Sequence, residues 1–119
     1  MNAVIKPDDD LIVLSYMPPA VPGMGALPIN AFLLMGPEPV LIDTGAIIDR
    51  DRFLAALRSV IDPGSIRSVF LTHEDIDHAG NLGPVLDPAP RARLALNFVG
   101  FAKLSAKVGL DPTRVWPRP

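Results

Sequence analysis

The order of the apolar segments constrains the fold of this chain most. Two stretches rich in branched aliphatic residues, Asp10–Met17 and Ile29–Met35, come first, and prolines and glycines separate them, which predicts two strands joined by a loop. A third short strand, Val40–Ile42, follows the turn residues Gly36-Pro37-Glu38-Pro39, so we expect a hairpin here. The chain therefore begins as a run of strands.

Beyond residue 45, segments with helical periodicity alternate with short apolar runs. Apolar residues recur at three- and four-residue spacing between Asp49 and Ile61, as on one face of a helix, and Asp62-Pro63-Gly64 ends the pattern. The remaining expected elements are a strand over Ile66–Leu71, a short helix over Leu82–Leu86, a strand over Arg91–Leu96 and a helix over Phe98–Leu110. This order favours a layered α/β fold with helices packed on a mixed sheet.

The composition limits which partners and which metal ligands this chain can have. The 119 residues carry a net charge of −2, with lysine and arginine spread along the chain, so nucleic acid is not an expected partner. No signal peptide is recognisable and no apolar run approaches the ~18 residues that span a bilayer, so we expect a cytoplasmic protein without membrane contact. Cysteine is absent, which leaves His, Asp and Glu as the strong metal ligands.

The segment after the fourth expected strand concentrates such ligands. His73 and His78 are the only histidines, and Glu74, Asp75 and Asp77 lie between them. In an extended chain residues 73, 75 and 77 would share one face and 78 the other, and on a helix 73 and 78 would lie about 140° apart. Only a curled loop would bring these side chains together, and divergent neighbouring ligands suit a dinuclear centre of the nitrogen and oxygen type.

This segment resembles the metal-binding loop of the metallo-β-lactamase superfamily. Members carry His-x-His-x-Asp-His after a strand, with Thr or Ser before it and Gly-Gly or Gly-Asn after it. The matching residues here are Thr72, His73, Asp77, His78, Gly80 and Asn81. Asp75 replaces the second histidine, which resembles the His-x-Glu-x-Asp-His loop of flavodiiron and related oxygen-binding diiron proteins. The resemblance runs from about Asp10 onward and implies the first half of an αββα sandwich.

The resemblance also implies roles for single residues. His73 and Asp75 would bind the first metal, and Asp77 and His78 the second. Asp77 would also contact the metal-bound water and take part in proton transfer, which makes it the catalytic candidate. The segment Leu41-Ile42-Asp43-Thr44-Gly45 resembles the superfamily motif at a strand end, whose Asp supports the metal loop, so Asp43 is expected to hold the loop rather than to bind metal.

The carboxylate of Asp75 adds an anionic oxygen ligand, which makes iron or manganese more favourable than three imidazoles would. The resemblance implies two divalent metals, iron or zinc. With zinc the implied chemistry is hydrolysis by a metal-activated hydroxide, and with two irons it is reduction or binding of a small gas molecule. The expected function is thus a metal-dependent hydrolase or a diiron oxidoreductase, acting on a small-molecule substrate or a small gas ligand. The alternatives are a non-catalytic metal- or oxygen-binding module and a degenerate half-domain that acts through a partner.

Several ligands of the superfamily have no counterpart in this chain. Members add two further histidines and a bridging acid downstream, whereas no histidine follows His78, and the later carboxylates, Asp87 and Asp111, lie in proline-flanked turns. We therefore expect residues 1–119 to form a single partial domain, truncated at its C-terminal side, with partial metal occupancy. A half-sandwich would expose a sheet edge and an apolar face, which predicts an oligomer or a partner chain covering them.

Simpler interpretations compete with these assignments. The loop could be a solvated acidic turn, and Asp43-Thr44-Gly45 could merely cap the segment before the helix. The number of matching positions after a strand favours the metal loop. Glu74 is expected to face solvent, and Tyr16 and Trp116 to be packing residues.

Overall fold

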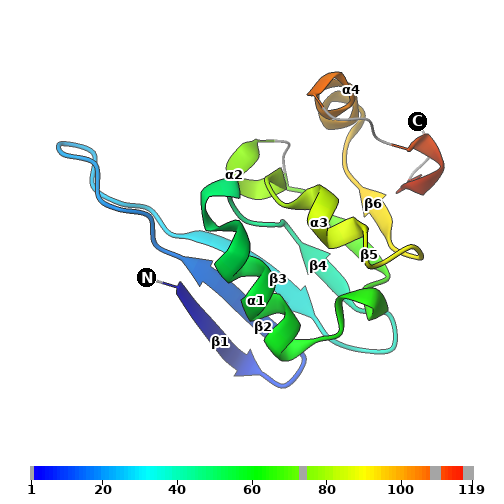
Figure 1. Cartoon of the computed structure of the whole chain (residues 1–119), viewed down its shortest axis with the longest axis horizontal. Helices are drawn as coiled ribbons and strands as arrows, with labels where there is room; N and C mark the ends of the chain where they lie inside the picture. Colours follow the sequence, from blue (N-terminus) through cyan, green and yellow to red (C-terminus); the bar gives the residue numbers. More distant parts are fainter. Residues whose placement is uncertain (1, 73–74, 108–110, 117–119) are drawn as a thin grey trace.

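A mixed β-sheet with helices packed against it organises the chain (Figure 1). The computed structural model describes residues 2–72, 75–107 and 111–116. In this part of the chain the strands lie side by side in sequence order: β1 (Asn2–Asp8), β2 (Leu11–Tyr16), β3 (Ile29–Leu34), β4 (Val40–Ile42), β5 (Ser68–Phe70), β6 (Arg93–Ala95) and β7 (Val115–Trp116). Strands β1 to β4 pair antiparallel, and β4 to β7 pair parallel. The predicted α/β class is confirmed.

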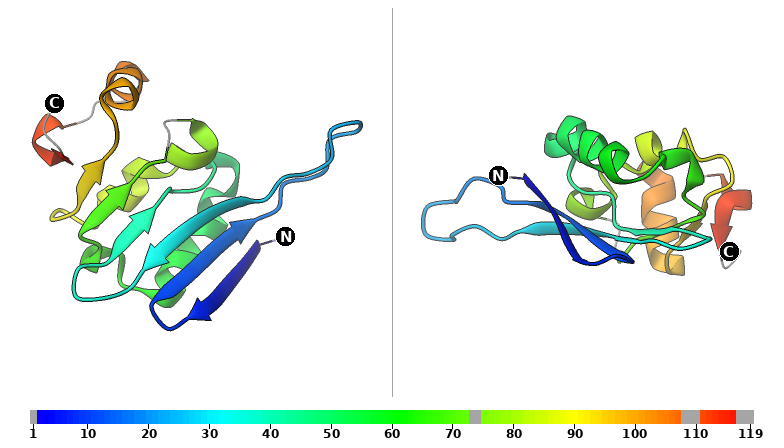
Figure 2. Two further views of the ribbon diagram at one scale, coloured as in Figure 1. Left: turned by 180° about the vertical axis from the view of Figure 1, so that it is seen from behind. Right: turned by 90° about the horizontal axis from the view of Figure 1, so that it is seen from below.

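Helical segments connect the parallel strands, because a parallel pair needs a crossover. The α-helices are α1 (Arg50–Val60), α2 (Ile76–Ala79), α3 (Leu82–Leu86) and α4 (Phe98–Lys107), and the 3₁₀ turns are η1 (Ile47–Asp49), η2 (Pro63–Ser65) and η3 (Pro112–Arg114). Helices α1 and α3 lie on the same face of the sheet (Figure 2). None of the described helices is long and apolar enough to cross a membrane.

The core lies between this face of the sheet and the helices. One register row crosses four strands through Leu33, Leu41, Val69 and Leu94, each of them at most 1% exposed. Leu57 of α1, at 0% exposed, belongs to the same cluster. Each such buried side chain contributes about 1.5–3 kcal/mol of transfer free energy, which holds α1 against the sheet.

The opposite face of the sheet carries a second apolar row. Its members are register partners across six strands, namely Ile5, Val13, Phe32, Ile42, Phe70 and Ala95. They are less buried than the helix-facing row, and Ile5 and Phe70 are 48% and 46% exposed. The left view of Figure 2 looks onto this face, with α1 and α3 behind the strands. We call these six residues the open row.

The ends of the chain differ from the sequence-based expectation. Strand β1 was not expected, because Lys6-Pro7-Asp8 breaks the apolar pattern, yet it pairs with β2 along an exposed edge. After residue 110 the chain forms η3 and then β7, which pairs with β6. Asp111 caps η3, and the hydroxyl and amide of Thr113 hold the pKa of its carboxyl below the usual value. The C-terminal segment is therefore part of the sheet.

Candidate metal centre

The site begins where two neighbouring parallel strands end. Ile42 of β4 pairs with Phe70 of β5, and the Asp43 amide continues the ladder with a 2.8 Å hydrogen bond to the Phe70 carbonyl. Asp43 therefore follows β4 at the same sheet edge at which Thr72 follows β5. Parallel strands place their carboxyl ends together, so residues 29 positions apart meet there.

Asp43 is the polar centre of this edge. Its side chain is 4% exposed, and Oδ1 accepts a 2.8 Å hydrogen bond from the Thr72 amide. The Thr72 hydroxyl oxygen lies 2.8 Å from Oδ2 and 3.0 Å from Oδ1. The backbone of Asp43 has φ = +65°, in the left-handed region that Asp tolerates better than most L-residues. The carboxylate thus ties the end of β4 to the start of the loop after β5.

The same carboxylate reaches the far end of that loop. Oδ2 of Asp43 lies 2.8 Å from Nδ1 of His78, whose side chain is 23% exposed. An ionised carboxylate only accepts hydrogen bonds, so Nδ1 carries the proton in this contact. Histidine ligands in metal sites are commonly oriented by such a carboxylate. The role of Asp43 in supporting a metal-binding histidine stays a prediction, and this contact is the geometry on which the prediction depends.

Thr44 and Asn81 fasten the backbone of the loop. The Thr44 amide and hydroxyl both donate to the His78 carbonyl, at 2.6 and 3.0 Å. The Asn81 side chain is 0% exposed, and its Nδ2 donates to the carbonyls of Thr44 (2.7 Å) and Ala46 (3.1 Å). The Gly80 amide donates to the Gly45 carbonyl at 3.1 Å. The segments 44–46 and 78–81 therefore form one hydrogen-bonded unit.

Arg50 is a positioning residue that sequence reasoning missed. Its Nε donates to Oδ1 of Asn81 at 3.0 Å, and one of its terminal nitrogens donates to the Gly80 carbonyl at 2.9 Å. An arginine at a helix start gives no sequence signal of this role, because its partners lie 30 and 31 positions away. The guanidinium holds the residues after His78 against the start of α1.

The other sequence-predicted residues are placed as follows. Asp75 precedes α2 in an extended conformation (φ −65°, ψ 153°), and its carbonyl accepts the amides of His78 and Ala79. Asp77 lies within α2. His73 and Glu74 lie outside the described residues, so the structure does not locate the proposed first-metal histidine. The loop is neither one strand nor one helix, since an extended residue precedes a single helical turn.

The donors found here are nitrogen and oxygen atoms, which fits iron, manganese or zinc. Within residues 2–72, 75–107 and 111–116, no three His, Asp or Glu side chains lie close enough together to hold a metal ion. The described part therefore shows one oriented imidazole with its supporting carboxylate, rather than a full coordination sphere.

Known proteins share both the sequence and the fold. The model of the metallo-beta-lactamase superfamily matches residues 24–90. A flavo-diiron protein from Clostridium acetobutylicum is 38% identical over 71 residues, which are 60% of this chain and 18% of that protein. The chain thus spans less than a fifth of that relative.

Solved structures with the same fold include a point variant of a flavo di-iron protein from Thermotoga maritima, with a TM-score of 0.83 and 21% identity over 97% of this chain and 31% of the other. Another is rubredoxin oxygen:oxidoreductase from Desulfovibrio gigas, with a TM-score of 0.80 and 20% identity over 95% of this chain and 30% of the other. The family match covers more than half of the chain and the fold agrees with it, so this chain belongs to the metallo-beta-lactamase superfamily.

Proposed function

We propose that this chain supplies the metal loop of a diiron oxidoreductase of the flavodiiron type, whose site takes a small gas molecule. The observation that carries the proposal is the contact between Asp43 and His78, because it orients an imidazole as a metal-binding histidine needs to be oriented. In the proposal His73 and Asp75 bind one metal, and Asp77 and His78 bind the other.

Asp75 favours iron over zinc in this proposal. A carboxylate is a harder ligand than an imidazole and adds a negative charge, which stabilises iron or manganese relative to zinc. The relative from Clostridium acetobutylicum is itself named a flavo-diiron protein. A pair of irons would supply the electron-transfer chemistry, while the protein supplies ligands and their orientation.

The chain's own residues would act on protons and geometry. Asp77 is the proposed proton-transfer residue, and Asp43, Thr44, Asn81 and Arg50 would keep the loop in one conformation. Rigid support of this kind matters because a metal ligand displaced by about 1 Å no longer binds well. The sheet edge is therefore proposed to be a preorganised half of a metal centre.

A non-catalytic metal- or oxygen-binding module is the second candidate. The observation that favours it is that His73 and His78 are the only two histidines and cysteine is absent, so few strong ligands are available. Such a module would bind metal weakly and would not catalyse a reaction. The hydrolase alternative would need zinc rather than iron at the same loop, so the metal preference separates it from the diiron proposal.

The direct test exchanges the ligand at position 75. We expect Asp75→His to shift the preference of the chain from Fe²⁺ towards Zn²⁺, because a neutral imidazole replaces an anionic oxygen. The ratio of the two dissociation constants, measured under anaerobic conditions by competition with a chromophoric chelator, reports the shift. Asp51→His, at an exposed position on α1, is the matched control. An unchanged ratio of dissociation constants in Asp75→His would show that Asp75 is not a metal ligand.

A further inference from the structure

Three arginines gather at the end of the sheet opposite the metal loop. Arg67 precedes β5, Arg91 precedes β6, and Arg93 is the first residue of β6. Because β5 and β6 are parallel, their amino ends lie at one edge, and the Arg93 amide donates to the Arg67 carbonyl at 3.0 Å. The topology therefore brings three positive charges together in a chain whose net charge is −2.

The guanidinium groups of these three arginines differ in their partners from those of the half-buried arginines Arg50 and Arg114. The side chains of Arg50 and Arg114 are bonded to carbonyl or amide oxygens. In contrast, Arg67, Arg91 and Arg93 are exposed, and within the described part of the chain none of their guanidinium groups has a hydrogen bond or a carboxylate within 4.0 Å. Their charge is available to a ligand.

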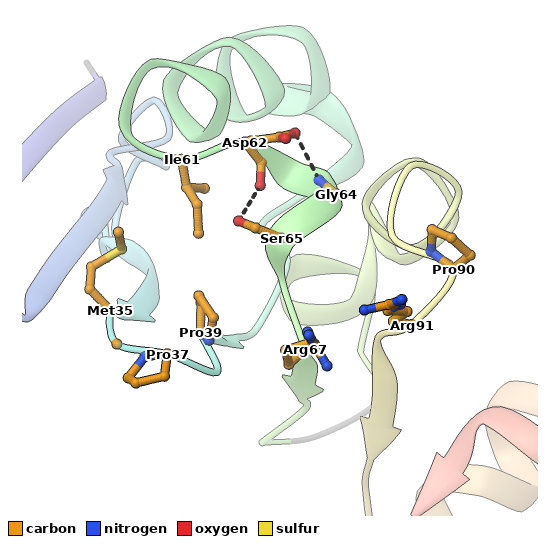
Figure 3. Close-up of a pocket in the computed structure, with 11 residues that line it drawn as sticks. Met35, Pro37, Pro39, Ile61, Asp62, Gly64, Ser65, Arg67, Pro90 and Arg91 are labelled. Carbon is orange, nitrogen blue, oxygen red and sulfur yellow. Dashed lines mark hydrogen bonds between the residues drawn. The ribbon is translucent and has the colours of Figure 1, made fainter.

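Arg67 and Arg91 line one side of a groove of about 570 Å³, and we call it the arginine groove (Figure 3). The facing wall is apolar and includes Met35, Pro37 and Ile61. The carboxylate of Asp62 also lines the groove, but its Oδ1 accepts the Gly64 amide at 3.0 Å within η2. The groove is thus cationic on one side and apolar on the other.

The walls of the groove are held by the backbone. The Pro39 carbonyl accepts the amides of Arg67 (2.9 Å) and Ser68 (3.3 Å), which fastens the β3–β4 turn to the start of β5. A Cβ atom on Gly64 would lie 3.1 Å from the Pro88 carbonyl oxygen, so the η2 turn packs closely on the segment that leads to Arg91. Prolines in the lining further restrict the backbone.

We propose that the arginine groove binds an organic oxyanion, a molecule with an apolar body that bears a phosphate or a carboxylate. Guanidinium groups bind both kinds of oxyanion through paired charge-assisted hydrogen bonds, and the apolar wall would contact the body of the ligand. This site is separate from the metal loop, because it lies at the amino ends of the strands that carry the loop at their carboxyl ends.

Binding is tested with three probes on the ¹⁵N-labelled chain: inorganic phosphate, phenyl phosphate and benzoate. We expect phenyl phosphate to saturate amide shifts around residues 65–68 and 90–93 with a roughly millimolar Kd, as suits a ligand of about ten heavy atoms. Arg67→Gln and Arg91→Gln should each weaken it about tenfold, because each removes a charge-assisted hydrogen bond. Arg52→Gln, at an exposed arginine outside this groove, should leave the Kd unchanged.

The probes also separate the sources of the ligand. Tighter binding of phenyl phosphate than of benzoate identifies a phosphate ligand, and the reverse order identifies a carboxylate. Met35→Gln tests the apolar wall, and we expect it to weaken phenyl phosphate more than inorganic phosphate. The proposal is overturned if no probe saturates, if phenyl phosphate binds no tighter than inorganic phosphate, or if Arg67→Gln behaves like Arg52→Gln in chains with native amide spectra.

Discussion

Oδ2 of Asp43 lies 2.8 Å from Nδ1 of His78, although 35 residues separate the two in the sequence. The contact joins the end of β4 to α2 and fixes the orientation of the imidazole ring through its Nδ1 atom. Since Asp43 also holds Thr72, one carboxylate supports both ends of the loop in which the proposed metal ligands lie.

Replacing Asp43 by Asn should change the state of the His78 ring. Asn tolerates φ = +65°, so the backbone can stay, but an amide has one oxygen where the carboxylate has two. Either Nδ1–H of His78 or the amide N–H of Thr72 then faces the NH₂ group of the Asn side chain, which cannot accept a hydrogen bond. We expect a shift of the His78 tautomer in ¹⁵N NMR, a 10–100-fold loss of metal affinity and a loss of about 1–3 kcal/mol of stability in urea unfolding.

Asp62→Asn is the matched control for this substitution, because Asp62 is exposed and its role as a cap suits Asn equally well. It should leave the His78 ring signals, the metal affinity and the stability unchanged. If Asp43→Asn kept the wild-type tautomer and metal affinity, the orienting role of Asp43 would be wrong.

Gly45→Ala should be strongly destabilising. Gly45 has φ = +71°, and a Cβ atom there would lie 3.0 Å from Cδ2 of the buried Phe53 ring. Backbone strain of about 1–2 kcal/mol and overpacking of about 1–3 kcal/mol would act together on the free energy of unfolding. Gly23 also has a positive φ, of +79°, but a Cβ atom there would meet nothing within 4 Å. Gly23→Ala should therefore lower the free energy of unfolding by the backbone strain alone. Equal losses in the two variants would contradict the packing argument.

The elements with regular patterns could be predicted from the sequence. The bounds of β4 and of α3 were both predicted to the residue, since turn residues delimit β4 and prolines follow α3. The helix expected over residues 49–61 exists as α1, because its apolar spacing gives it one buried face. Local pattern therefore sufficed wherever an element buries a continuous stripe of side chains.

Features set by distant contacts could not be predicted. Strand β1 depends on pairing with β2 rather than on its own apolar pattern, and β7 is too short to show one. The positive φ of Asp43 leaves no mark on the sequence, because the fold imposes it. The motif identified Asp43 and Asn81, but the arrangement of their hydrogen bonds emerges only when β4 and β5 lie side by side.

The open row predicts self-association. Phe70 is the fifth of the six residues of this apolar row and is 46% exposed, so we propose that a second copy of the chain covers it. Phe70→Gln should lower the apparent mass in sedimentation experiments at high concentration. Val99→Gln removes an exposed apolar side chain from α4 instead, at 60% exposure, and should leave the mass unchanged. Equal effects of both variants would point to non-specific association.

The metal content of the purified chain tests the central claim most directly. The chain should be loaded anaerobically with Fe²⁺, dialysed against a chelator, and analysed for bound metal per molecule, with His78→Gln as the comparison. The chain has only two histidines and no cysteine, so we predict less than one tightly held metal in the wild type and less still in the variant. Two retained metals per chain, or equal retention in His78→Gln, would contradict the account of the site.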